Sequence, residues 1–370
     1  MYVCLVHDMI SLHVLGTASA KPTKDRNVSG SFLNGPSGSF LIDCGEGMQQ
    51  RIASHDRWLR SIGSNERTKM SKIQAIYLTH AHLDHCWGVL PMLHSMDKIG
   101  RKSRLEIHGP TSTAALNWVK DRPGEVPDSE SGIYPGDLAI QFDWWKKHGG
   151  KNGAFQFEVD WILYPVDQVG IEGISVSDQD EMSVHAYVTN HLDVPSFAYL
   201  FSTPELQGKF DRSAAIADGH DEESIRKIAL DISDSAKYRG PNRPSRSILI
   251  SGDTTSGVPS FLELKSSVDV IIHESTFDDS HQSKATAYGH STARDAATIA
   301  SHIGAKFLGL THFSSRFQDL SHLEEEARSV YNQSHTLNDG DRISIELDGS
   351  IHLERKGLEE WISIAHVMES

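Results

Sequence analysis

Short runs of β-branched and other apolar residues recur along the chain and alternate with segments whose apolar residues repeat every three or four positions. The first pattern is typical of buried strands and the second of amphipathic helices. In Thr292–Ile303 the apolar residues fall on one helical face, and Ser291 or Thr292 is a natural N-cap. The chain is therefore predicted to be an α/β protein with a sheet-rich core and covering helices. The predicted strands are Ile10–Leu15, Ser39–Ile42, Ile73–Leu78, Arg104–His108, Ser247–Ser251, Val268–His273, Lys306–Thr311 and Arg342–Leu347.

Two segments interrupt this alternation. Residues Trp118 to Gln179 are rich in Gly, Pro, Asp and Trp, and residues Pro204 to Arg246 carry many charges of both signs. Neither segment is of low complexity, and no repeat at solenoid spacing is found in the sequence. We expect a single domain over residues 1–370, with these two segments, at about 118–179 and 204–246, as insertions.

A cluster of metal-binding residue types follows one predicted strand. The run Ile73–Thr79 leads directly into His80, His82, Asp84 and His85. In an extended segment side chains alternate between faces, so His80 and His82 project together and can share one ion. Asp84 and His85, further along, can turn to a second ion. With 21 His in the chain a chance cluster is conceivable, but this density behind a buried strand favours a two-metal hydrolase site.

Three later residues can complete such a site, because each ion needs at least four ligands and a carboxylate usually bridges two cations. His191, Asp253 and His312 each follow a strand-like run. A lone His or Asp at a strand end is more often an ordinary hydrogen-bonded residue than a ligand. Their joint appearance behind the first cluster favours the interpretation as ligands.

Composition places the protein among ordinary globular chains, with 370 residues of which 38% are hydrophobic. No run approaches the roughly 18 apolar residues of a membrane helix, and the N-terminus has no signal-peptide pattern. The sparse cysteines, Cys4, Cys44 and Cys86, favour a reducing compartment, so we expect a cytoplasmic protein. We interpret Cys86 as a packed side chain and residues 1–8 as an upstream-start artefact or a short disordered tail before Met9.

The formal net charge is −15. Such a surface repels a polyanion unless basic residues gather locally or metal ions supply a positive field. The acidic balance therefore weakens the case for a nucleic-acid substrate without excluding it.

The arrangement of these residues resembles the metallo-β-lactamase superfamily and, within it, the ribonuclease Z family of tRNA 3′-processing endonucleases. The loop Pro22–Asn27 is similar to that family's loop of Pro, Lys, Arg and Asn, and Asp43–Gly47 to its turn after the second strand. The resemblance runs from about Ile10 to Leu347 and implies the metallo-β-lactamase fold, a four-layer αββα sandwich. Three further segments follow in the family's order: His273–Phe277, Gly289–Thr292 and Thr311–Phe317.

Carried over residue by residue, the resemblance implies two zinc ions. One is held by His80, His82 and His191, the other by Asp84, His85 and His312, and Asp253 bridges them. The resemblance also implies that Asp84 is the base for the attacking water and that His290, oriented by Glu274, protonates the leaving 3′-oxygen. A His/Asp set with open positions also admits manganese or iron.

The resemblance further implies a precursor tRNA substrate and a homodimer. In the loop Pro22–Asn27, Lys24 and Arg26 would contact phosphates and Asn27 sugar or base, while Arg316 would clamp a phosphate near His312. An isolated basic turn would more often be merely solvated. If these cations gather at the site, an acidic protein can still bind RNA.

The sequence departs from the family pattern in three places. Met48 stands where the family usually has Thr. The stretch of chain between the first histidine cluster and His191 is longer than usual, owing to the segment 118–179. The family's basic, Gly/Pro-rich arm begins here as Gly208–Asp211, but residues 220–240 do not continue it and are not net basic. We expect a zinc-dependent phosphodiesterase, foremost an endoribonuclease that removes 3′ trailers from precursor tRNA. The alternatives are a cyclic-nucleotide-like phosphodiesterase, a catalytically silent metal- or RNA-binding subunit and, more weakly, a lactonase or thioesterase.

Overall fold

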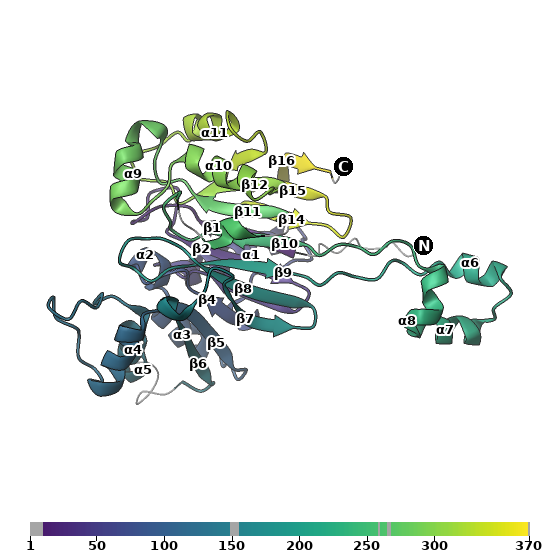
Figure 1. Ribbon diagram of the computed structural model, residues 1–370, viewed down its shortest axis with the longest axis horizontal. Coiled ribbons are helices and arrows are strands. Elements are labelled where there is room, and N and C mark those ends of the chain that lie inside the picture. The colour runs from purple at the N-terminus through teal and green to yellow at the C-terminus, as the bar shows by residue number, and fades with distance from the viewer. Residues whose placement is uncertain (1–9, 149–154, 258–259, 265–267, 369–370) are drawn as a thin grey trace.

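The computed structural model describes residues 10–148, 155–257, 260–264 and 268–368 (Figure 1). Two sheets dominate this part of the chain. Strands β3 to β6 of the first sheet are mutually parallel, and its other neighbours are antiparallel. In sheet order the strands are β16 (Trp361–Val367), β15 (Ile351–Lys356), β14 (Arg342–Ile345), β1 (Ile10–Gly16), β2 (Gly30–Gly35), β3 (Gly38–Ile42), β4 (Ile73–Tyr77), β5 (Leu105–Thr111) and β6 (Val159–Pro165).

The second sheet mixes two pairing modes. Strands β10 to β13 are parallel, whereas β7, β8 and β9 join as an antiparallel meander. The carboxyl ends of parallel strands meet at one edge, so residues just after β10, β11 and β12 are brought together. In sheet order the strands are β13 (Ser334–Thr336), β12 (Phe307–Thr311), β11 (Val270–Glu274), β10 (Ser247–Ile250), β9 (Phe197–Ser202), β8 (Met182–Val188) and β7 (Ile174–Gln179).

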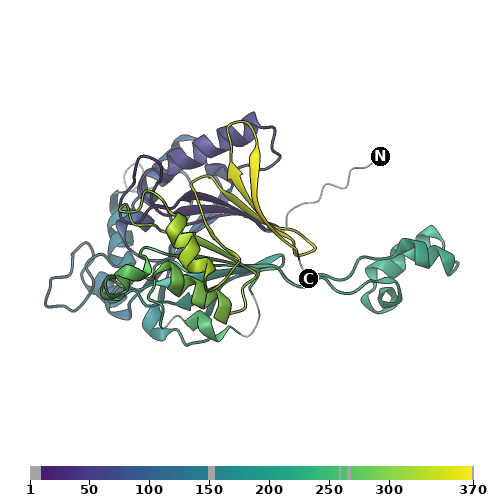
Figure 2. The ribbon, with the colours of Figure 1, turned by 90° about the horizontal axis from the view of Figure 1, so that it is seen from above.

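Helices cover the outer faces of both sheets, and Figure 2 shows the two sets on opposite sides of the molecule. One core cluster lies between the sheets and includes Leu12, Phe201 and Ile272. A second cluster packs the first sheet against α1 (Met48–Ser61), α3 (Val89–Lys98) and α5 (Leu138–His148). A third packs the second sheet against α10 (Ala293–His302) and α11 (Ser321–Arg328). The predicted four-layer αββα sandwich is therefore confirmed.

Each strand predicted from the apolar runs is present, and the predicted helix in the segment 292–303 is α10. That helix begins with a capping box, in which the Thr292 side chain accepts from the Asp295 N–H and the Asp295 carboxylate accepts from the Thr292 N–H. The remaining helices are α2 (Leu83–Cys86), α4 (Thr113–Asp121), α6 (Arg212–Ala217), α7 (Glu222–Leu230), α8 (Ile232–Ser235) and α9 (Gln282–Tyr288).

The two irregular segments differ in structure. The segment 118–179 supplies α5, β6 and β7 to the sandwich itself. The segment 204–246 leaves the second sheet between β9 and β10 and protrudes as an arm that carries α6, α7 and α8 at its tip (Figure 1). A small core of Ala215, Ile225 and Tyr238 holds the tip together.

Residues 1–8, for which the sequence suggests an upstream start or a tail, lie outside the described residues. Across the described ranges, every helix is too short or too polar to cross a bilayer.

Candidate metal centre

The first histidine cluster lies where β4 gives way to a one-turn helix. His80 and His82 precede this helix, and His82 has the extended backbone of an N-cap. Asp84 and His85 lie within α2, so the predicted strand end is followed by a short helix that carries these two residues.

The first group of ring nitrogens comes from three histidines. His82 Nδ1 lies 3.0 Å from His80 Nε2 and 3.1 Å from His191 Nε2. Two nitrogens that share a tetrahedral zinc ion at the usual bond length lie about 3.3 Å apart. The three rings therefore converge as ligands of one ion would. Together with an Asp253 oxygen, their ligand atoms lie within 4.8 Å of one another.

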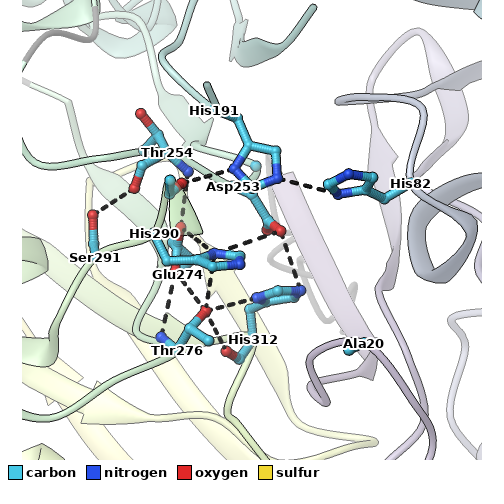
Figure 3. Close-up of polar contacts among 12 residues, drawn as sticks. Ala20, His82, His191, Asp253, Thr254, Glu274, Thr276, His290, Ser291 and His312 are labelled. Carbon is cyan, nitrogen blue, oxygen red and sulfur yellow. Dashed lines mark hydrogen bonds and ion pairs between the residues drawn. The ribbon is translucent and has the colours of Figure 1, made fainter. Parts of the chain in front are cut away.

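The second group joins α2 to the end of β12. His85 Nε2 lies 3.2 Å from His312 Nε2, and Asp84 Oδ2 lies 3.4 Å from the same His312 nitrogen. Asp253, just after β10, faces both groups, with oxygens 3.5 Å from His85 Nε2 and 3.8 Å from His80 Nε2. Figure 3 shows Asp253 between His191 and His312. Its position is that of a carboxylate able to bridge two cations.

Contacts behind the rings fix which nitrogen faces the centre. His191 Nδ1 donates to the Gly289 carbonyl at 2.7 Å, and His85 Nδ1 donates to Asp43 Oδ2 at 2.7 Å. Because each Nδ1 carries the proton, each Nε2 keeps its lone pair for a metal. Gly289 has a φ of 74°, and a Cβ there would come within 3.0 Å of His191 Nδ1. This close approach requires glycine.

The electrostatics of the cluster fit a divalent cation. Burial, reinforced by neighbouring histidines, lowers the pKa of His80 well below its usual value and that of His82 to about 4, which keeps both rings neutral as ligation requires. Burial opposes ionisation of Asp253, yet His312 and His85 hold its pKa well below the usual value. Burial lowers the pKa of His85, but Asp253, Asp43 and Asp84 outweigh it and raise that pKa well above its usual value. The buried carboxylates therefore favour a positive charge at this point, which a metal can supply.

A second buried pair lies beside the cluster. His290, at the turn before α10, donates from Nδ1 to Glu274 Oε1 at 3.0 Å, and Glu274 ends β11 (Figure 3). Glu274 also accepts from the Thr254 N–H at 2.8 Å and the Thr276 hydroxyl at 2.6 Å. Burial lowers the pKa of His290, but Glu274 and Asp253 outweigh it and raise the pKa to about 9. His290 is therefore positively charged at neutral pH.

The loop Pro22–Asn27 begins near the cluster, because Ala20, two residues before it, donates from its N–H to Asp84 Oδ2 at 2.7 Å. Its polar residues have different surroundings. Lys24 is exposed, whereas Arg26 donates to the Phe317 carbonyl at 2.6 Å and Asn27 donates to the Glu46 carbonyl at 3.1 Å. Exposed Arg316 lies over the Phe277 ring at 4.9 Å. Lys24 and Arg316 are thus exposed, whereas Arg26 and Asn27 also make hydrogen bonds within the protein.

Sequence reasoning missed the outer contacts of the site. The sequence marks Asp43 only as part of a turn, yet its carboxylate accepts from His85 Nδ1 and from the Thr79 N–H at 2.8 Å. No pattern in the sequence marks a role for Thr276, although its hydroxyl lies 2.9 Å from His312 Nδ1. A conspicuous signal for Asp43 was its place at the end of a buried strand, the same signal that marked Asp253.

The layered fold and a paired His/Asp centre at the strand ends define a metallo-β-lactamase-fold protein. The short form of human tRNase Z is 23% identical, with a TM-score of 0.57 over 90% of this chain and 98% of that one. The metallo-β-lactamase fold protein YhfI from Bacillus subtilis is 17% identical with a TM-score of 0.57, covering 90% of this chain and 99% of its own. A family model described as "Anti-Pycsar protein Apyc1" matches residues 10–133.

Relatives of higher identity define the family. Ribonuclease Z of Methanothermobacter thermautotrophicus is 31% identical over 87% of this chain and 92% of its own length. Ribonuclease Z of Gemmatimonas aurantiaca is 30% identical over 90% of this chain and 95% of its own. Ribonuclease Z of Myxococcus xanthus is 28% identical over 87% and 93%. The chain belongs to the ribonuclease Z family of metal-dependent hydrolases.

Proposed function

We propose that this chain is a zinc-dependent endoribonuclease that removes the 3′ trailer from precursor tRNA. One observation carries the proposal: His290, which donates to the buried Glu274 carboxylate, lies 3.8 Å from Asp253, the carboxylate shared by the two ligand groups. An acid beside a paired metal centre suits a substrate whose leaving group is a poor one, as the 3′-oxygen of RNA is. Members of the family are named Ribonuclease Z, which supports an RNA substrate.

We assign His80, His82 and His191 to one ion, Asp84, His85 and His312 to the other, and Asp253 to both. Two zinc ions would lower the pKa of a bound water and offset charge that builds on the phosphate. Asp84 takes the proton of the attacking water, whose oxygen bonds to phosphorus. As the bond from phosphorus to the 3′-oxygen breaks, His290 gives its proton to that oxygen. The products are a tRNA with a 3′-hydroxyl and a trailer with a 5′-phosphate.

Exposed cations near the centre support RNA binding despite the net charge of −15. Lys24 and Arg316 lie on two segments that approach each other, since Arg26 of the loop donates to the Phe317 carbonyl. We propose that both bind phosphates of the substrate, which would concentrate positive charge at the site. Arg26 and Asn27 position that loop.

We also propose that the protein acts as a homodimer. The arm leaves the far end of β9 and returns into β10, whereas His191 and Asp253 lie at the opposite ends of these strands. The arm therefore projects away from the centre of its own subunit (Figure 1). An arm on one subunit could present the substrate to the centre of the other. The free, buried thiols of Cys44 and Cys86 support a reducing, cytoplasmic location.

The test is cleavage of a precursor tRNA beside bis-p-nitrophenyl phosphate and a cyclic nucleotide, with zinc or manganese added. We expect metal-dependent cutting at the 3′ end of the acceptor stem, lost in His82→Ala. The matched control is His302→Ala, which removes an exposed histidine on α10. Turnover of the small diesters without tRNA cleavage would place the chain among small-molecule phosphodiesterases. Inactivity on every substrate, with metal bound, would indicate a silent binding subunit.

A further inference from the structure

The segment that carries α5 is fixed against the metal centre. Buried Asp137 accepts from the Ser112 N–H at 3.1 Å and the Ala139 N–H at 2.8 Å, which ties the start of α5 to the end of β5. Leu138, Phe142 and Trp145 are buried in the same cluster as α3. The turn just before α5 is therefore held rigidly beside the first sheet.

Gln141 links this turn to the histidine cluster. Its side-chain amide donates at 2.7 Å to the carbonyl of Ala81, the residue between His80 and His82, and also at 2.7 Å to the carbonyl of Gly136. Its amide oxygen accepts from Cys86 Sγ at 3.4 Å. The backbone of the cluster and the turn at Gly136 are therefore coupled through one side chain.

Tyr134 begins that turn, and the Asp137 N–H donates to its carbonyl at 3.0 Å. Its ring is half-buried against the core cluster beneath it and lies over Gly136, where a Cβ would come within 2.8 Å of the ring and its hydroxyl. The ring is 6.2 Å from that of His82 at an angle of 82°. A rigid, partly exposed aromatic surface thus borders the ligand group of His82.

We propose that Tyr134 is a substrate-binding residue whose ring stacks on the base of a nucleotide next to the scissile phosphate. Aromatic side chains beside unpaired RNA bases commonly bind them by stacking, because every base offers a flat face. The position of the Tyr134 ring fits this role. It borders the ligand group of His82, so a phosphate bound at the metal centre would have the base of an adjoining nucleotide near this ring. Gln141 is then a positioning residue that acts through the turn. The inference rests on the proposed action on RNA.

The experiment compares Tyr134→Ala and Tyr134→Phe on a precursor tRNA and on copies that lack the base on either side of the cut. Loss of one stacked base weakens binding on the order of tenfold or more. We expect Tyr134→Ala to raise KM by about that factor with a smaller change in kcat, and Tyr134→Phe to remain near wild type. Removing the base that stacks on Tyr134 should slow cleavage by the wild type by a similar factor. The same removal should leave the rate of Tyr134→Ala unchanged, because that variant has no ring to stack on.

Two controls separate this role from a structural one. Metal content is measured for each variant, because the ring borders His82, and the matched variant is Trp144→Ala, which removes an aromatic of α5 that is 45% exposed and stacks on His148. The inference would be overturned if removing either base slowed Tyr134→Ala by the same factor as the wild type, so that the two effects multiply. An unchanged KM in Tyr134→Ala would overturn it as well. A wild type that fails to cut precursor tRNA would instead overturn the proposed function and this inference with it.

Discussion

Glu274→Gln removes one negative charge from the His290 pair and keeps the shape of the side chain. The Glu274 carboxylate lies 3.0 Å from His290 Nδ1 and is the main group that raises the pKa of this ring. Burial acts in the opposite direction. Without the charge of Glu274, the imidazolium is therefore no longer favoured over the neutral ring.

The size of the effect follows from the pKa. His290 has a pKa of about 9 against an ordinary 6.5, and we expect the variant to return toward 6.5. A fall of about 2.5 units corresponds to about 3 kcal/mol between the two protonation states. At pH 8 the protonated fraction would fall about 30-fold, whereas at pH 5.5 it would change little. An acid catalyst must be protonated, so activity is lost as pH rises through its pKa.

The assay is the single-turnover rate of precursor tRNA cleavage between pH 5.5 and 9.5, with equal metal content in all variants. In the plot of rate against pH, the fall on the alkaline side (the alkaline limb) should lie near pH 9 in the wild type and near neutrality in Glu274→Gln. His290→Ala should be slow throughout and lack that limb. An alkaline limb that stays near pH 9 in Glu274→Gln would refute the assignment of His290 as the acid held by Glu274.

Three further predictions concern metal, salt and acid. Asp43→Asn should weaken metal binding about 10- to 100-fold in a chelator competition, because Asp43 orients His85, and an unchanged affinity would contradict that role. Lys24→Ala should reduce the slope of log binding constant against log salt concentration for tRNA by about one unit, without affecting hydrolysis of bis-p-nitrophenyl phosphate. A slope equal to that of the wild type would argue against a phosphate contact. Burial lowers the pKa of His13 to about 3 and that of His55 to about 2, so both stay neutral in the fold and take up protons on unfolding below about pH 6.5. Unfolding at pH 5 should therefore cost about 2 kcal/mol less for each histidine than at neutral pH, and the fall should be shallower in His55→Leu.

The sequence predicts much of the strand pattern and the composition of the metal centre because both depend on short-range signals. A run of apolar residues specifies a buried strand, and polar residues at the ends of parallel strands meet at one edge. Asp253 and His312 are far apart in the chain, yet each follows such a strand, and their side chains lie 3.4 Å apart.

The remaining features depend on orientation and on contacts through irregular backbone, which spacing does not encode. Arg26 looks like a free cation in the sequence, but its guanidinium points to the Phe317 carbonyl. Tyr134 lies in a Gly/Pro-rich stretch, where no periodicity indicates which residue faces the site. The predicted set omits several strands, among them β9, although its run of aromatic and apolar residues is itself typical of a buried strand.

Hydrolysis of precursor tRNA in ¹⁸O-labelled water tests the central claim most directly. If the metal centre activates water against the phosphate at the end of the acceptor stem, a single label enters the 5′-phosphate of the released trailer. The tRNA then ends in an unlabelled 3′-hydroxyl, and His82→Ala forms neither product. A 2′,3′-cyclic phosphate on the tRNA, or a label on its own 3′ end, would contradict the account.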